Sequence, residues 1–251
     1  MILPALMVLV SVAGGDQDQK DFVAANEKAL AGDHPAAAAL YGHLLSRGVT
    51  HEDVYFNLGT SAARAGKLLE AVVAYERALA VEPEDADARH NLSSIRARLR
   101  PKDREASGSV HGTDLILSVI GGIPRRPLRW LAVGSHALIY LFWFFRARSR
   151  SDVARSRLGM GLLFTGLIFA TSALVAVGHE VAAHEVRAVA LEAAPVREGP
   201  HERYAEASKL YAGEPLRVLA RDSDWAQVRG EDGRTGWLSQ TSIEVVAGAG
   251  R

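Results

Sequence analysis

The sequence contains no cysteine among its 251 residues, and this absence excludes several kinds of chemistry at once. Disulfide bonds, thiol catalysis and zinc sites built on thiolates all require cysteine. A lipid-anchored amino terminus is excluded as well, because that anchor forms on a cysteine just after the export signal. The chain also has no excess of charge, with 29 basic and 29 acidic residues. A surface for binding nucleic acid is therefore not indicated.

The sequence also lacks a recognisable catalytic or metal-binding motif. His179 and His184 resemble the start of a zinc-protease motif, but that motif places its histidines four residues apart on one face of a helix. Five residues of separation turns the two side chains about 140° from each other around a helix axis. We therefore expect no enzymatic activity, no metal and no other cofactor.

The amino terminus is apolar over residues 2–13, a stretch that is too short to cross a hydrocarbon core of about 30 Å. Small residues at Ser11 and Ala13 then match the spacing that signal peptidase cleaves. No Lys or Arg precedes the apolar stretch. We expect residues 1–14 to be an export signal, with a buried amino-terminal helix as the alternative.

Residues 18–99 are rich in alanine, follow a helical period, and repeat themselves at a spacing of about 34 residues. The recurring positions are Gly32, Ala37, Tyr41 and Leu45, followed by Gly66, Ala71, Tyr75 and Leu79. This period, with two helices in each unit, resembles the tetratricopeptide-repeat family. The resemblance implies about two repeats and a capping helix over residues 86–99, with Gly59 and Ala71 small where helices touch and Tyr75 filling the groove.

The resemblance also implies a peptide-binding inner face on these helices. In the family's register that face carries Phe22, Asn26, Phe56, Asn57, Thr60, Arg64 and His90. Asn26 and Asn57 match the paired asparagines with which family members hold the terminal carboxylate of a peptide. The cationic positions beside them are occupied instead by Phe22, Asp87 and Asn91. We therefore expect a neutral or apolar peptide segment, with packing inside the chain as the alternative.

Two longer apolar segments follow a polar linker at residues 100–127, which has room for a short helix in the membrane interface. Residues 128–145 and 158–178 are each long and apolar enough to cross a bilayer. The loop at 146–157 between them holds five arginines, which favour the cytoplasmic side. Together with the export signal, this loop predicts a protein of the bacterial inner membrane with both soluble domains in the periplasm.

Some polar and small residues lie inside these two apolar segments. Ser135 and His136 are expected to face the second helix. Gly166 and Ala170, at small-xxx-small spacing, indicate close packing between the two helices.

From residue 185 to 247 the pattern changes to short alternating runs separated by turn residues. About five strands in about sixty residues predict a small closed β-barrel. Residues 195–200, Gly213-Glu214, Asp224-Trp225 and 233–238 resemble the bacterial SH3 family. A glycine at 236, just before Trp237, lets two backbones approach closely.

The SH3 resemblance implies a ligand groove edged by Tyr211, Trp225 and Trp237, with core positions for the two tryptophans as the alternative. Relatives of this family in the bacterial cell envelope associate with wall glycan or with protein partners. The fold alone does not choose between them.

The expected fold class is a multidomain membrane protein with an all-α tetratricopeptide-repeat domain, a two-helix transmembrane hairpin and a small all-β SH3-like barrel. This order of parts resembles the BatE-type proteins of the aerotolerance operon. The resemblance implies a periplasm-facing scaffold that works in the lipid bilayer beside von Willebrand A-domain membrane proteins and a MoxR-type ATPase. The alternative is a wall-binding anchor, in which the barrel binds peptidoglycan and the repeats recruit a wall enzyme.

Overall fold

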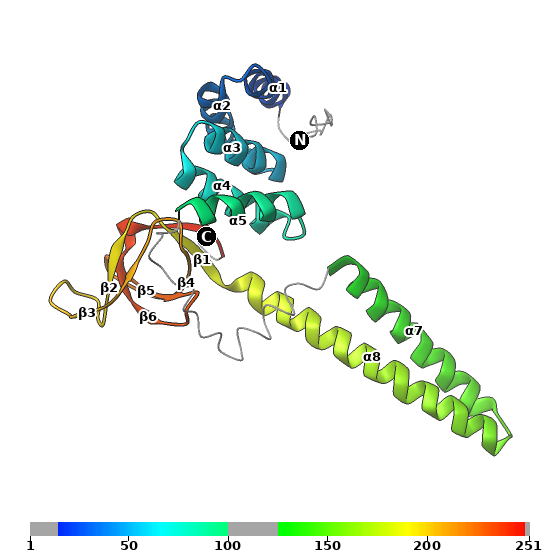
Figure 1. Cartoon of the computed structure of the whole chain (residues 1–251). Helices are drawn as coiled ribbons and strands as arrows, with labels where there is room; N and C mark the ends of the chain where they lie inside the picture. The colour runs from blue at the N-terminus through cyan, green and yellow to red at the C-terminus, as the bar shows by residue number, and fades with distance from the viewer. Residues whose placement is uncertain (1–14, 100–124, 249–251) are drawn as a thin grey trace. The chain divides into compact units, whose positions relative to one another are not determined.

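Residues 15–99, the described part of the first half of the chain, form five α-helices (Figure 1). The computed structural model describes residues 15–99 and 125–248. The predicted export signal at residues 1–14 lies outside the described residues, as does most of the predicted linker at 100–127. The helices are α1 (Asp16–Leu30), α2 (His34–Ser46), α3 (Glu52–Arg64), α4 (Leu68–Val81) and α5 (Ala86–Leu99). We call them together the helical region.

The repeat seen in the sequence is also a repeat of the backbone. Gly32 and Gly66 each follow the first helix of a helical hairpin, and both have a φ of 82°. Glycine is favoured there because this left-handed conformation strains residues that carry a Cβ. The amide of Gly32 donates to the carbonyl of Ala29 and that of Gly66 to the carbonyl of Ala63, both at 3.2 Å. The two hairpins therefore turn in the same way.

Each hairpin is filled by one buried tyrosine from its second helix. Tyr75 is 2% exposed, and a Cβ added at Gly59 would lie 3.0 Å from its ring. Phe56 packs edge-on against Tyr75 at 5.7 Å between ring centroids, and Phe22 packs in the same way against Tyr41 at 6.0 Å. Burial of such a ring contributes about 1.5–3 kcal/mol. The small residue at 59 and the ring at 75 occupy the places expected from the sequence.

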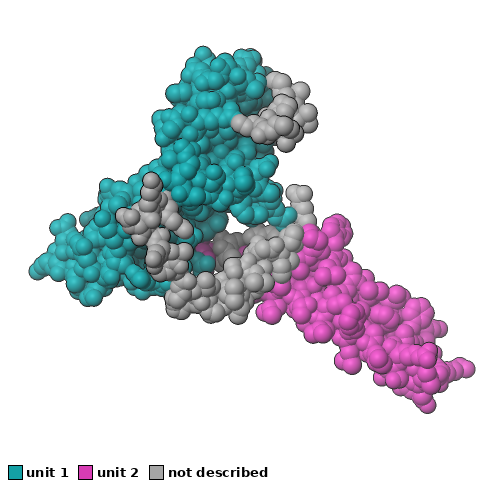
Figure 2. Space-filling model, in the orientation of Figure 1, with its two compact units in different colours: residues 1–108, 186–251 teal, residues 109–185 magenta. Residues whose placement is uncertain are grey.

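The chain divides into two compact units, shown in Figure 2. The first unit combines Met1–Gly108 with Val186–Arg251, and the second is Ser109–Glu185. The described part of the second unit is a helical hairpin of α7 (Arg125–Arg148) and α8 (Asp152–His184). The two helices run side by side in opposite directions (Figure 1).

Both helices of this hairpin are long and apolar enough to cross a membrane, over Trp130–Arg148 and Asp152–His179. Only 6% of the apolar stretch of α7 and 11% of that of α8 is buried. A core helix of a soluble domain would be mostly buried. α7 continues to Arg148 and α8 begins at Asp152, so parts of the predicted loop at 146–157 are helical. Arginine favours helix, and the Ser151 hydroxyl accepts a hydrogen bond from the amide of Ala154 at the start of α8.

α7 packs closely against a different glycine of α8 from the one expected. A Cβ at Gly161 would lie 2.9 Å from the ring of Phe142. A Cβ at Gly166 would meet nothing within 4 Å, so the prediction that Gly166 marks close packing is wrong. Gly161 therefore makes room for the ring of Phe142 and does not face a second small residue.

His136 faces the second helix of the hairpin as expected. Its ring centroid lies 5.2 Å from that of Phe169 on α8 and 5.0 Å from that of Tyr140 on α7. Ser135 is buried as well, at 4% exposed, and its hydroxyl donates to the carbonyl of Ala132 on its own helix at 3.0 Å.

The last part of the chain is an antiparallel sheet of seven strands, which we call the β-domain. The strands are β1 (Val186–Ala190), β2 (Ala194–Arg197), β3 (Glu206–Leu210), β4 (Pro215–Asp222), β5 (Trp225–Gly230), β6 (Thr235–Ser239) and β7 (Ile243–Ala247), with a 3₁₀ turn η1 (Gln240–Ser242) before the last. Their order in the sheet is β3-β2-β6-β5-β4-β1-β7. The predicted barrel of about five strands is therefore corrected to seven, in a linear order with β3 and β7 at its two ends.

The glycine before Trp237 holds two strands of the β-domain close together. A Cβ at Gly236 would lie 2.3 Å from Cγ1 of Val196 and 2.8 Å from the carbonyl oxygen of Arg197. Both distances are below any that real Cβ atoms make. The close backbone approach expected at this glycine is thus found between β6 and β2.

Candidate functional site

The two tryptophans of the β-domain lie on the outer face of β5 and β6. Ala226, Val228 and Leu238 alternate with them and are at most 1% exposed, inside the sheet's core. Because successive side chains of a strand point to opposite faces, Trp225 and Trp237 point outward, where both are half-buried. The register pairs Trp225 with Ser239 and Gln227 with Trp237. The tryptophans are therefore diagonal neighbours on one face.

A cationic side chain extends this face on the neighbouring strand. Arg197 of β2 is directly opposite Trp237 of β6. The Arg197 guanidinium donates to the carbonyl of Tyr204 at 2.9 Å and lies 3.8 Å from the carboxylate of Glu206. The positive charge of Arg197 and the amide of Gln227 therefore lie on the same face as the two indole rings. We call Arg197, Trp225, Gln227 and Trp237 the aromatic face.

A turn at one edge of the aromatic face is fixed by a residue that the sequence did not point to. The Gln240 side-chain amide donates to the carbonyls of Ser223 at 2.7 Å and Trp225 at 3.3 Å, and its backbone amide donates to the carbonyl of Asp224 at 2.8 Å. Ser223 has a φ of 51°, a left-handed conformation that a turn must hold in place. Gln240 therefore stabilises the turn from which Trp225 projects. A single glutamine bound to backbone carbonyls has no sequence signature.

Tyr211, the third residue of the predicted groove, is placed apart from the two tryptophans. It precedes Pro215, where β4 begins, and its carbonyl accepts from the amide of Glu214 at 3.2 Å. Trp225 pairs with Asp222 at the other end of β4. The register thus brings Trp225 and Trp237 together and leaves Tyr211 at the opposite end of the β4–β5 hairpin.

Tyr204 adds an exposed aromatic ring that sequence reasoning missed. It lies in the connection between β2 and β3 and is 49% exposed. Its ring covers Gly199, where an added Cβ would lie 2.7 Å from the ring atoms. The signal available in the sequence was an isolated tyrosine among charged residues, which by itself does not distinguish a binding residue from a solvated loop.

Four of the seven residues predicted on the inner face of the helical region are used in packing within the chain. Phe22 and Phe56 pack against the buried tyrosines, as described above. The Tyr41 hydroxyl donates to the Asn26 side-chain oxygen at 2.6 Å, and the hydroxyls of Thr60 and Tyr75 are 2.9 Å apart. These side chains have partners inside the hairpins, which matches the alternative of packing within the chain.

The other three predicted inner-face residues are accessible. Asn57 is half-buried, and Arg64 and His90 are exposed. Asn57 and Arg64 come from α3, and His90 comes from α5. They offer an amide, a guanidinium and an imidazole to a ligand, which is a polar rather than an apolar set.

The buried phenols of the helical region stay neutral. Burial raises the pKa of Tyr41 above that of an ordinary phenol. Burial also raises the pKa of Tyr75, against the hydrogen bonds from Thr60 and Asn91, which lower it. Both hydroxyls therefore keep their protons and act as structural hydrogen-bonding groups.

A group of carboxylates lies at the start of α3. Burial raises the pKa of Glu52 to about 8, with further contributions from a hydrogen bond to Asp85 and from the charge of Asp53. Nδ1 of His51 lies 3.3 Å from the carboxylate of Asp53. Within residues 15–99 and 125–248, no group of three His, Asp or Glu side chains is arranged to hold a metal ion.

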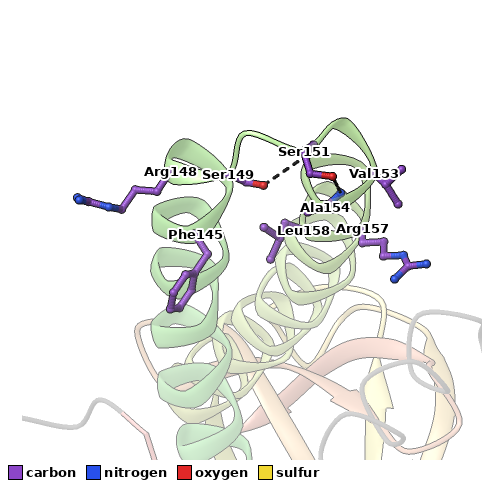
Figure 3. Close-up of a pocket in the computed structure, with 8 residues that line it drawn as sticks. All are labelled: Phe145, Arg148, Ser149, Ser151, Val153, Ala154, Arg157 and Leu158. Carbon is purple, nitrogen blue, oxygen red and sulfur yellow. Dashed lines mark hydrogen bonds between the residues drawn. The ribbon is translucent and has the colours of Figure 1, made fainter.

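A cavity of about 660 Å³ lies at the turn between α7 and α8 (Figure 3). Its lining residues are Phe145, Arg148, Ser149, Ser151, Val153, Ala154, Arg157 and Leu158. The side chains of Arg148 and Arg157 point away from each other (Figure 3). The guanidinium of Arg148 also lies 5.4 Å from the centroid of the Phe144 ring. These two charges therefore do not converge on one ligand.

Comparison with known proteins identifies one part of the chain. No curated protein is significantly similar to it. The family described as "Bacterial SH3 domain" matches residues 192–244. The matched segment contains β2 to β6, η1 and all four residues of the aromatic face. The β-domain is therefore a bacterial SH3 domain over residues 192–244.

Proposed function

We propose that this protein is a membrane-anchored scaffold that binds protein partners through its β-domain and its helical region. The observation that carries the proposal is the aromatic face of the bacterial SH3 domain. Trp225 and Trp237 are diagonal neighbours there, half-buried, and flanked by Arg197 and Gln227. Aromatic and arginine side chains on a firm support are the groups that dominate binding at protein interfaces.

The helical region is, in this proposal, a tetratricopeptide-repeat domain of about two repeats and a capping helix. The equal backbone geometry at Gly32 and Gly66, and the buried tyrosines at equivalent positions of the two hairpins, support this assignment. Its inner face offers Asn57, Arg64 and His90 to a partner. This polar set favours a peptide with hydrogen-bonding groups over the apolar segment that the sequence alone suggested.

The hairpin of α7 and α8 anchors the scaffold in the bacterial inner membrane. Its two apolar helices are mostly exposed, as helices surrounded by lipid would be. The arginines at 146, 148, 150, 155 and 157 lie at the turn of the hairpin and favour the cytoplasmic side for it. The helical region and the β-domain would then both face the periplasm.

The order of these parts supports a BatE-type adaptor, which works beside von Willebrand A-domain membrane proteins and a MoxR-type ATPase. The test is affinity purification of the tagged full-length chain from crosslinked native membranes, with mass spectrometry of the partners. A chain carrying both Trp225→Ala and Trp237→Ala is the matched control. Recovery of von Willebrand A-domain proteins or a MoxR-type ATPase by the natural chain, reduced in the control, is expected. If neither class of protein is recovered, the adaptor proposal is rejected.

The aromatic face also favours a second candidate, a cell-wall anchor. Indole rings beside an amide and a guanidinium suit a sugar chain as well as a peptide, because they combine an apolar surface with hydrogen-bond donors. Cosedimentation of the detergent-solubilised chain with purified peptidoglycan tests this candidate. Sedimentation that is lost in the double tryptophan variant would favour the anchor over the adaptor. No part of the site suggests catalysis, and we propose that the protein is not an enzyme.

A further inference from the structure

The strand β1 of the β-domain is buried on both of its faces. Ala188 and Ala190 point into the core of the β-domain and are 1% exposed. Val189 lies between them, so it points to the outer face, yet it is 0% exposed. On the adjacent β7, Ile243 and Val245 pack in the core of the β-domain. An outer face that is fully buried in a small sheet must be covered by another part of the chain.

Helices α4 and α5 cover this face. Val189 and Val246 belong to the same buried cluster as Val72 of α4 and Leu92 and Ile95 of α5. α4 lies against β7. α5 is the last helix of the helical region, and in an array of helical hairpins the last helix exposes the surface that a following unit would cover. The outer face of β1 and β7 takes the place of that unit.

Charged groups surround the apolar contact and join the same elements. Glu76 of α4 is 7% exposed, and its carboxylate lies 2.7 Å from the guanidinium of Arg96 and 4.0 Å from that of Arg187 on β1. Arg77 of α4 forms an ion pair with Glu244 of β7. The alternation that points Val189 and Val246 at the helices also points Arg187 and Glu244 there. The polarity of the two surfaces therefore matches as well as their shape.

A glycine turn completes the contact. Nε of Arg96 donates to the carbonyl of Gly213 at 3.3 Å. Gly213 has a φ of 83°, and an added Cβ would lie 2.9 Å from Cδ1 of Leu99. The glycine is thus needed for the turn and also for the approach of α5.

We infer that the outer face of β1 and β7 is a docking surface for α4 and α5 of the same chain, which holds the helical region and the β-domain together as one body on one side of the membrane. The two surfaces belong to segments that precede and follow the hairpin of α7 and α8. If they touch, both ends of the hairpin lie on the same side, so both helices or neither cross the bilayer. This last step rests on the proposed membrane anchor. The docking leaves the aromatic face uncovered, because that face is on β2, β5 and β6.

The natural absence of cysteine makes the test direct. Arg77→Cys and Glu244→Cys are introduced together in the full-length chain, and native membranes are treated with a short bismaleimide. Arg77→Cys with Thr235→Cys is the matched control, since Thr235 is exposed on β6, three strands away from β1. We expect a crosslink within single chains that forms at least tenfold faster than in the control. Equal rates in the two pairs, or crosslinks only between two chains, would overturn the inference.

A second measurement examines the side of the membrane. Each single variant, Arg77→Cys and Glu244→Cys, is labelled with a membrane-impermeant maleimide from one side of sealed vesicles. Both are expected to react from the same side, and reaction from opposite sides would refute the docking. Neither result depends on which partners are purified, so a failed adaptor proposal would leave this inference standing, and the reverse also holds.

Discussion

The hydroxyl oxygen of Tyr75 lies 2.9 Å from the hydroxyl oxygen of Thr60, on the helix before it. The same contact occurs in the preceding hairpin with different chemistry, where the hydroxyl of Tyr41 donates to the amide oxygen of Asn26 at 2.6 Å. Tyr75 also accepts a hydrogen bond from the side chain of Asn91 at 3.3 Å. In each helical hairpin, therefore, a tyrosine hydroxyl bonds to the preceding helix. In the second hairpin, the side chain of Asn91 also links α5 to the Tyr75 hydroxyl.

Removal of either phenol hydroxyl should destabilise the helical region. Tyr41→Phe leaves the Asn26 oxygen without its donor, and Tyr75→Phe removes the partner shared by Thr60 and Asn91. A loss of about 1 kcal/mol is expected for each, since this is the usual net value of a buried hydrogen bond. Hydrogen exchange of peptides from α1 to α5 in the detergent-solubilised chain measures the change.

The matched control is a double-mutant cycle with the bonding partner. Asn26→Ala combined with Tyr41→Phe should cost less than the sum of the two single changes, because both remove the same bond. Additive losses would show that the phenol acts through packing alone.

The helical hairpins were predictable from sequence because their packing rules repeat along the chain. A tyrosine and the small residue it faces recur at a fixed spacing, so Gly59 and Tyr75 could be paired from the sequence alone. The sheet was harder, since β3 is mostly exposed and shows no alternation, and β2 contains Pro195. The expected count of about five strands therefore fell two short of the seven in the β-domain.

The site was predictable only in part, because its geometry depends on contacts between distant segments. The outward direction of Trp225 and Trp237 follows from alternation, but the separation of Tyr211 from them follows from the register of β4 and β5. Burial of Val189 on the outer face depends on α4 and α5, which precede the whole α7–α8 hairpin in the chain. No local pattern reports such a contact.

Two glycine-to-alanine changes should have opposite effects on stability. Gly236→Ala places a methyl group where Val196 and the carbonyl of Arg197 already lie, at 2.3 and 2.8 Å. Because a backbone atom has to move, a loss of about 1–3 kcal/mol is expected in the β-domain. Gly42→Ala lies within α2 with nothing within 4 Å, so a gain of about 0.5–1 kcal/mol is expected in the helical region.

Hydrogen exchange of peptides from β2 and β6, compared with peptides from α2, distinguishes the two effects. Slower exchange in α2 and faster exchange in the β-domain are the expected pattern. An unchanged β-domain in Gly236→Ala would mean that β6 and β2 are not in close contact.

The stability of the helical region should fall as the pH rises through neutrality. Burial beside Asp85 and Asp53 raises the pKa of Glu52 to about 8 from 4.5. The folded chain therefore binds a proton that the unfolded chain releases, so this contribution to stability is complete below pH 4.5 and is lost as the pH rises to 8. Glu52→Gln removes the ionisable group and should flatten the dependence in this window.

Thermal unfolding of the solubilised chain between these pH values measures the effect. Glu27→Gln, an exposed change on α1, is the control and should keep the slope of the natural chain. A slope that persists unchanged in Glu52→Gln would assign the pH dependence to another group.

The aromatic face should lose its ligand when either tryptophan is removed. Trp225→Ala and Trp237→Ala each take away a large half-buried ring from the outer face, and a tryptophan at the centre of an interface often contributes about 2 kcal/mol. Binding to purified peptidoglycan, or recovery of protein partners from native membranes, should therefore weaken roughly 30-fold. Gln240→Ala should weaken it less, because the turn before Trp225 loses its hydrogen bonds while the ring remains. Leu219→Ala, at an exposed position of β4, is the matched control and should bind as the natural chain does. Full binding by both tryptophan variants would place the ligand on another face of the β-domain.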